Sequence, residues 1–212
     1  MKTMQFLKKK KALIIIIAMA CIFVGIAGIL FLRLRNGVVL KATTETAIQE
    51  PITKYRQDDA LWEQDKLGNS KYTMESSGCL VSCVATAVSM NGNEITPGEL
   101  NALFSENGVY DEEGNLQWGE VDDIIGYHAE VFSEVSNAII DECLREGHYP
   151  VVRVRMQGIG NFHYVLIVGS EAGEYLCMDP LRDEITELSE YGERVYAIRC
   201  VWYEKTAQFI CL

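Results

Sequence analysis

Residues 79–90 read CLVSCVATAVSM, a run without a single charged side chain. Its length and alanine content favour a buried helix over a strand, and Asn91-Gly92 is a typical helix C-terminus. Gly78 and Cys79 stand at the expected helix start, where partial positive charge favours the nucleophilic thiolate form of a cysteine. Cys79 is therefore a candidate nucleophile, although a free cysteine can also be a small buried apolar residue. Cys83 lies one turn later on the same face and serves as a comparison for Cys79, because nothing about its position exposes its thiol.

Around this run, helical patterns come first and strand-like patterns follow. Thr96-Pro97-Gly98-Glu99 forms a capping box with proline at the first helical position, which predicts a helix ending near residue 107. Further helices are expected at 118–127 and, after the cap Ser136, at 137–146. The later β-rich runs predict strands at 151–156, 162–169, 174–178 and 194–203. Helices first and an antiparallel sheet second indicate an α+β fold.

The N-terminal segment differs in charge from the rest of the chain. Residues 1–35 hold seven Lys or Arg and no Asp or Glu, which leaves −18 for the other 177 residues of a chain with net charge −11. Residues 12–32 form an uncharged apolar run of 21 residues, long enough for a helix to span roughly 30 Å of hydrocarbon. We therefore expect a basic cytoplasmic N-terminus at 1–11, a transmembrane helix at 12–32, a linker or stalk at 33–51, a domain at 52–205 and a tail at 206–212.

Flanking charges predict the orientation of this helix. Four consecutive lysines precede it, whereas the other flank holds only Arg33, Arg35 and Lys41. The more basic flank stays in the cytoplasm, so the domain is expected outside the cell membrane on a single-pass anchor. A cleaved signal peptide is an alternative, but the apolar run is longer than usual and no small-residue cleavage site clearly ends it. Ala18-Met19-Ala20-Cys21 is faintly similar to a lipoprotein box, yet the apolar run continues past Cys21.

Six of the seven cysteines lie outside the apolar head. Outside the cell they could form up to three disulfides, although their spacings match no compact disulfide framework and their pairing stays open. No CxxC motif or Cys/His cluster indicates a zinc site. We therefore expect neither a metal nor a cofactor.

A thiolate nucleophile needs a base, and the base needs an orienting group. His163 begins one strand of a predicted hairpin, and Asp179 follows the second strand. Because the first residue of one hairpin strand lies beside the last residue of the other, the Asp179 carboxylate should approach the His163 ring and hold one tautomer. The alternative is a structural strand histidine and an Asp-Pro turn. His128 and His148 lack such a partner and are interpreted as surface or helix-cap residues.

Several short motifs occur together in order along the chain. They are Gln57-x-Asp59-x-x-Trp62, Lys66-Leu67-Gly68, Ser77-Gly78-Cys79, the run from His163 to Gly169 (HYVLIVG) and Met178-Asp179-Pro180. In this combination the chain resembles the papain-like cysteine peptidases of the bacteriocin-leader-processing type, specifically their stand-alone C39-like relatives. The resemblance covers roughly residues 52–203 and implies a papain-like fold.

The resemblance also implies roles for individual residues. Cys79 would be the nucleophile, His163 the general base and then acid, and Asp179 the group that orients His163. Gln57 would donate to the oxyanion together with the Cys79 backbone N–H. Gln64 is a rival seven positions later, but the QxDxxW spacing favours Gln57. Leu80 departs from the family pattern, which often has glycine directly after the cysteine.

These features favour a bacterial, membrane-anchored, extracytoplasmic thiol peptidase that hydrolyses a peptide or protein substrate through an acyl-enzyme. A catalytically inactive papain-like binding domain and a related isopeptidase or acyl transferase are the alternatives. The acidic domain argues against nucleic acid as a partner, disfavours acidic wall polymers and mildly favours basic peptides. Leader-processing relatives act in the cytoplasm, so a double-glycine leader is not the expected substrate. Substrate preference and oligomeric state stay open.

Overall fold

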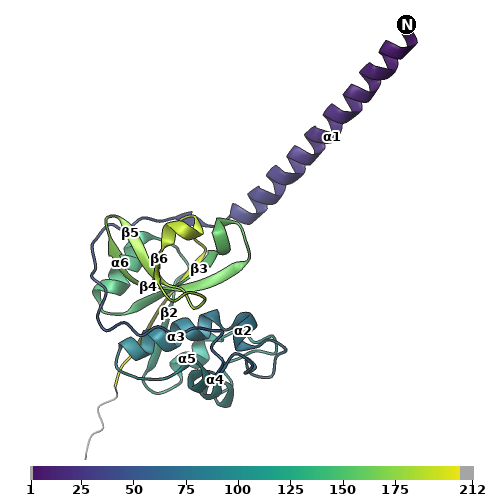
Figure 1. The fold of residues 1–212 in the computed structure, drawn as a ribbon. Coiled ribbons are helices and arrows are strands. Elements are labelled where there is room, and N and C mark those ends of the chain that lie inside the picture. The colour runs from purple at the N-terminus through teal and green to yellow at the C-terminus, as the bar shows by residue number, and fades with distance from the viewer. Residues whose placement is uncertain (1, 206–212) are drawn as a thin grey trace, which may run out of the picture. The chain divides into compact units, whose positions relative to one another are not determined.

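The structure is a computed structural model that describes residues 2–205, with side chains from residue 14 onward. It divides into Met1–Gly37 and Val38–Leu212. The first unit contains the helix α1 (Lys2–Leu34; Figure 1), whose part Ile14–Leu34 is long and apolar enough to cross a membrane. By the same length and composition it could be a signal sequence. The predicted tail 206–212, with Cys211, lies outside the described residues.

The buried helix predicted at residues 79–90 is confirmed as α3 (Cys79–Met90), in which every residue from 81 to 89 is buried. It is preceded by a single turn, α2 (Met74–Ser77), which the sequence did not indicate. The predicted capping box begins α4 (Pro97–Glu106), where Thr96 and Glu99 exchange hydrogen bonds between side chain and backbone. In Figure 1 the helices α2 to α5 gather on one side of the domain.

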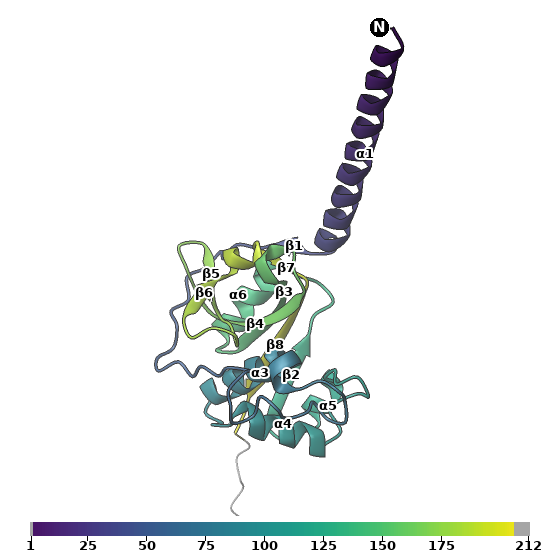
Figure 2. The same cartoon turned by 45° about the vertical axis from the view of Figure 1, so that its right-hand side comes forward.

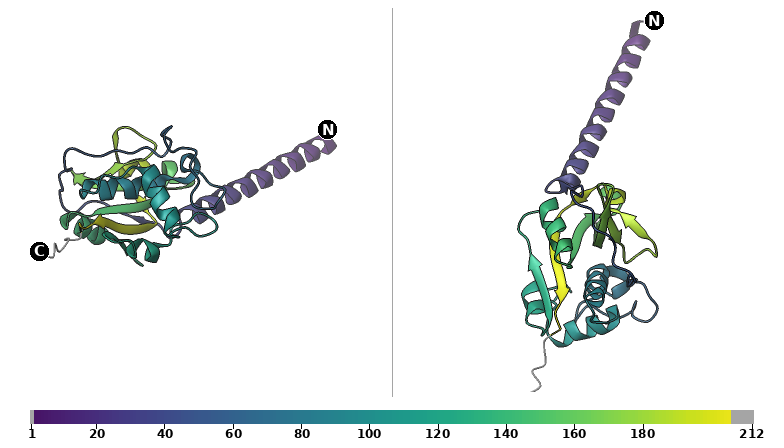
Figure 3. Two further views of the ribbon diagram at one scale, coloured as in Figure 1. Left: turned by 90° about the horizontal axis from the view of Figure 1, so that it is seen from below. Right: turned by 90° about the vertical axis from the view of Figure 1, so that its left-hand side faces the viewer.

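Six antiparallel strands form the other side of the domain (Figures 1 and 3). Their spatial order is β2-β8-β3-β4-β5-β6. The bounds are β2 (Tyr127–Val131), β3 (Tyr149–Arg155), β4 (Phe162–Glu171), β5 (Glu174–Met178), β6 (Ile185–Glu187) and β8 (Ala197–Tyr203). Short 3-10 turns follow β3 and β6 as η1 (Met156–Gly158) and η2 (Leu188–Tyr191). The mixed helix and antiparallel sheet layout confirms the predicted α+β class.

Two predicted elements differ from the structure. The helix expected at 118–127 is only α5 (Trp118–Asp122), because the chain turns at Gly126, with φ +86°, into the unpredicted edge strand β2. The strand expected at 194–203 is split into β7 (Arg194–Val195) and β8. Both differences arise where a short element is defined by its pairing partner rather than by its own pattern.

The segment expected to form a linker at 33–51 contacts the domain over part of its length. Its residues Val38–Val39 form β1, which pairs with β7 (Figure 2). Leu40 is buried, and Thr46 forms a bridge with Ser170 on β4. The Thr-rich composition did not indicate this, because backbone pairing does not require an apolar pattern.

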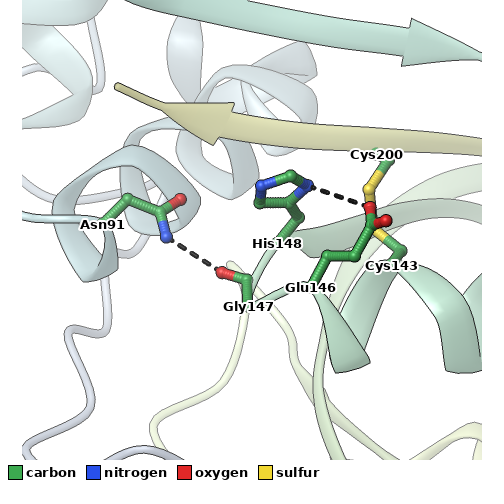
Figure 4. The surroundings of a disulfide bond; sticks show 6 residues. All are labelled: Asn91, Cys143, Glu146, Gly147, His148 and Cys200. Carbon is green, nitrogen blue, oxygen red and sulfur yellow. Dashed lines mark hydrogen bonds and ion pairs between the residues drawn. A yellow bond between two sulfur atoms is a disulfide. The ribbon is translucent and has the colours of Figure 1, made fainter. Parts of the chain in front are cut away.

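A disulfide fastens the remaining helix to the sheet. Cys143 on α6 (Asn137–Arg145) bonds to Cys200 on β8, with 6.1 Å between their Cα atoms (Figure 4). Nearby, the Asn91 side chain donates to the Gly147 carbonyl at 3.0 Å, which ties the end of α3 to the turn after α6. The sequence leaves this pairing open, and 57 residues separate these two cysteines.

Candidate active site

Cys79 is the first residue of α3 and is partly exposed. The residue before it must be glycine for steric reasons. A Cβ on Gly78 would lie 2.5 Å from the Met74 carbonyl oxygen and 2.8 Å from the Met74 Cα. This close approach lets the chain pass directly from α2 into α3, and so it places the thiol at the helix N-terminus, as the sequence predicted.

The predicted contact between His163 and Asp179 is present. His163 Nε2 lies 2.7 Å from Asp179 Oδ1, and both side chains are buried. The strand register differs from the simple hairpin expectation, because Met178 pairs with Leu166 rather than with the start of β4. Extending this register by one residue places Asp179 opposite Val165, two positions from His163 on the same face. The two side chains meet as diagonal neighbours.

Electrostatic surroundings favour the protonated form of His163. Burial of the ring lowers its pKa, but hydrogen bonds to Asp179 and to Cys79, with the charges of both, raise this pKa to about 9. Since Nε2 contacts Asp179, the ring nitrogen left for the thiol is Nδ1. The arrangement can therefore take a proton from the thiol and hold it on the imidazole at neutral pH.

The Asp179 carboxylate is fully buried, and four groups surround it. Besides His163, the Leu181 backbone N–H donates to Oδ1 at 2.9 Å, the Tyr191 hydroxyl donates to Oδ2, and Arg182 Nε lies 3.9 Å from Oδ2. Burial raises the pKa of Asp179, but the bonds from His163 and Tyr191 bring it below its usual value. An uncompensated buried charge costs several kcal/mol, so these partners are what keep the carboxylate ionised.

Tyr191 is the part of this arrangement that sequence reasoning missed. It lies at the end of η2, 1% exposed, and twelve residues after the carboxylate that it contacts. Burial and the contact with Asp179 raise the pKa of Tyr191, so the hydroxyl remains a neutral donor. No local pattern marks it, because the surrounding residues, Leu-Ser-Glu-Tyr-Gly, read as an ordinary polar turn.

The two glutamines considered for the oxyanion role are clearly distinguished by burial. Gln57 is 4% exposed, and its Nε2 donates to the Glu75 carbonyl at 2.7 Å, on the helical turn just before Cys79. The Gln57 backbone N–H donates to the Pro180 carbonyl at 2.9 Å, next to Asp179. Nε2 carries two hydrogens, so one N–H remains available after the bond to Glu75. Gln64 is exposed, and its Nε2 donates to Glu63 Oε1 at 3.5 Å.

The other cysteine and histidine candidates lie apart from this arrangement or cannot act in it. Cys83 is fully buried, with its sulfur 3.5 Å from the Tyr164 carbonyl oxygen, and burial raises the pKa of this thiol. His128 and His148 both stack on Trp202, at centroid distances of 5.2 and 4.2 Å. Both are partly exposed, His128 on β2 and His148 directly before β3, and the His148 backbone N–H caps the end of α6 by donating to the Cys143 carbonyl at 3.0 Å. This agrees with the surface or helix-cap role that the sequence suggested.

A pocket of about 820 Å³ opens beside Cys79. Its lining includes Leu80, Tyr164 and Trp118 near the sheet, and Glu112 and Glu113 from the loop before α5. The volume is within the range of sites that bind small molecules or peptide side chains. Among the residues that the structure describes, no group of three or more His, Cys, Asp or Glu side chains could hold a metal ion.

Comparisons with known proteins add a distant likeness of fold. No protein-family model matches the chain, and no curated protein matches it. A solved structure from Bacillus anthracis, described as that of a candidate C39-like peptidase, is similar over 76% of this chain and 98% of its own. The identity is 13% and the TM-score 0.48, so the likeness is distant and concerns the fold alone.

We predict that Tyr191→Phe raises the pKa of His163 above its value of about 9. The variant keeps the ring packing but removes a hydrogen-bond donor from the buried Asp179 carboxylate, whose negative charge is then less compensated and attracts the imidazolium more strongly. An NMR titration of the histidine rings measures the shift.

Tyr175→Phe is the matched control for this experiment. Tyr175 is also buried, and its hydroxyl donates to Asp141 at 2.6 Å, away from His163. Both variants should lower the free energy of unfolding by on the order of 1–2 kcal/mol. The control should leave the pKa of His163 unchanged. An identical His163 titration in the two variants would show that Tyr191 has no role in holding the pair.

Proposed function

We propose that this chain is a cysteine peptidase that hydrolyses a peptide or protein substrate through a thiol acyl-enzyme. The observation that carries the proposal is the relay from the buried Asp179 through His163 to Cys79 at a helix N-terminus. A nucleophile, a base in contact with it and a buried group orienting the base are the elements of nucleophilic acyl transfer.

In this mechanism His163 Nδ1 receives the thiol proton, and the Cys79 sulfur attacks the substrate carbonyl carbon. The oxyanion that forms accepts hydrogen bonds from the remaining Gln57 Nε2–H and from the Cys79 backbone N–H. His163 then protonates the leaving amine, which departs and leaves a thioester on Cys79. A water molecule, deprotonated by His163, hydrolyses the thioester and releases the acid product.

The test is labelling and turnover with matched variants. A thiol-directed affinity probe should label Cys79 before the other cysteines of the domain, and a peptide library should be cleaved by the wild-type chain. Cys79→Ala and His163→Ala should each lower cleavage by at least about a thousandfold, because the residues act as one unit. Mass spectrometry of labelled and cleaved peptides provides both measurements.

His128→Ala is the control, since its side chain stacks on Trp202 outside the relay. Labelling that survives in Cys79→Ala would reject the nucleophile. Labelling without any cleavage would favour the inactive binding domain. Products joined to an added amine rather than to water would favour an acyl transferase.

We also propose that the domain lies outside the cytoplasmic membrane, anchored by α1. The basic N-terminal flank supports this orientation, and so does the Cys143–Cys200 disulfide, since disulfides persist in oxidising compartments.

For the full chain in a bacterial host, we predict that protease added to intact cells digests the domain. We also predict that Cys143 and Cys200 react with a maleimide mass tag only after reduction. In contrast, a chain lacking residues 1–35 and kept in the reducing cytoplasm should expose both thiols to the tag without prior reduction. A domain protected in intact cells would place it on the cytoplasmic side.

A further inference from the structure

Two arginines of this acidic domain have no acidic partner. Arg153 on β3 and Arg199 on β8 lie on the same face of the sheet, because Arg153 pairs with Ala197 and Arg199 with Val151. They are therefore diagonal neighbours on adjacent strands. Within the described part of the chain, no Asp or Glu oxygen lies within ion-pair distance of either guanidinium.

Their partial burial makes this arrangement costly. The Nε atoms of Arg153 and Arg199 are both buried and have no hydrogen-bond partner among the described residues. Arg199 donates from Nη1 to its neighbouring Ile198 carbonyl at 2.7 Å. Burial, together with the nearby positive charge of Arg153, lowers the pKa of Arg199. Two like charges without a counter-ion are unfavourable here, and an added carboxylate would offset this cost.

The pair adjoins the pocket that contains Cys79. Arg199 lies over the Trp118 ring, 5.7 Å from its centroid, and Arg153 is directly opposite Tyr164 across the strands. Trp118 and Tyr164 both line the pocket. Arg153 also lies 4.5 Å from the centroid of Phe162, the residue before His163. The two guanidiniums thus adjoin aromatic residues of the pocket lining and the strand that carries the candidate base.

We propose that Arg153 and Arg199 bind a carboxylate of the substrate, so that the enzyme prefers acidic peptides. This proposal rests on the proposed function and names its substrate class. Guanidinium groups bind carboxylates with paired, charge-assisted hydrogen bonds. Glu112 and Glu113 on the loop side of the pocket repel a second acidic group, which confines the preference to one substrate position. A local pair therefore overrides the preference for basic peptides expected from the net charge.

The test uses the full chain in detergent micelles and pools of random decapeptides. In each pool one position is fixed as Glu or as Gln, and each pool is made with a free or an amidated C-terminus. We expect one position, or the free C-terminus, at which the carboxylate form is cleaved about tenfold faster (kcat/KM). A preference for a fixed Glu indicates an acidic side chain, and a preference for the free terminus indicates the terminal carboxylate.

Variants connect the preference to the two arginines. Arg153→Gln and Arg199→Gln should each remove the preference, so that the ratio of kcat/KM between the Glu and Gln pools, or between the free and amidated termini, falls to about one. Arg153→Lys keeps the charge but loses the paired donors, and it should retain only part of the preference. Arg145→Gln is the control for net charge, since Arg145 pairs with Glu142 on the exposed side of α6.

A binding measurement keeps this test independent of catalysis. Fluorescence anisotropy of labelled pools on Cys79→Ala should show the same roughly tenfold preference, even if no pool is cleaved by the wild type. If no pool is cleaved but the binding preference is present, the peptidase proposal is rejected and the proposed carboxylate site at the two arginines is retained. Equal binding of Glu and Gln pools and of both termini, or a preference that persists in both Gln variants, would overturn the arginine site.

Discussion

The buried carboxylate of Asp179 is the constraint on which the rest of the site depends. It lies at the end of β5 with no solvent exposure, so its charge must be stabilised entirely by groups that the fold supplies. His163, Leu181 and Tyr191 each donate a hydrogen bond to it. The charge in turn raises the pKa of His163, and that imidazole faces Cys79. The charge of this buried acid, together with Cys79, thus favours the protonated form of a base two strand positions away.

The relay exists only because distant parts of the chain pack together. Cys79 comes from a helix whose residues 81–89 are all buried, and His163 comes from the strand β4. The Cys83 sulfur contacts the Tyr164 carbonyl and so joins this helix to that strand, one turn beyond the nucleophile. The backbone bond from Gln57 to Pro180 joins the segment before α2 to the turn that holds Asp179. Residues outside the chemistry therefore fix the relative positions of the three groups.

Local sequence patterns predicted the elements whose own residues are sufficient to define them. The apolar run at 79–90, the capping box at Thr96 and the cap at Ser136 all appear as helices with nearly the predicted bounds. The contact of His163 with Asp179 was also expected, although through direct pairing rather than as diagonal neighbours. Tyr191, the Cys143–Cys200 disulfide and the arginine pair were not predicted, because each depends on side chains brought together across strands. The edge strand β2 was missed for a related reason, since its pairing with β8 defines it.

The most direct test of the coupling is the pH dependence of Cys79 alkylation by iodoacetamide, compared between the wild type and Asp179→Asn. If His163 holds the thiol proton, the wild type should react rapidly at neutral pH, with a change in rate centred near pH 9, where the imidazole loses its proton. Asp179→Asn should move that change to lower pH, because the orienting negative charge is gone. A rate that follows a single lone-thiol titration and is the same in both proteins would contradict the account.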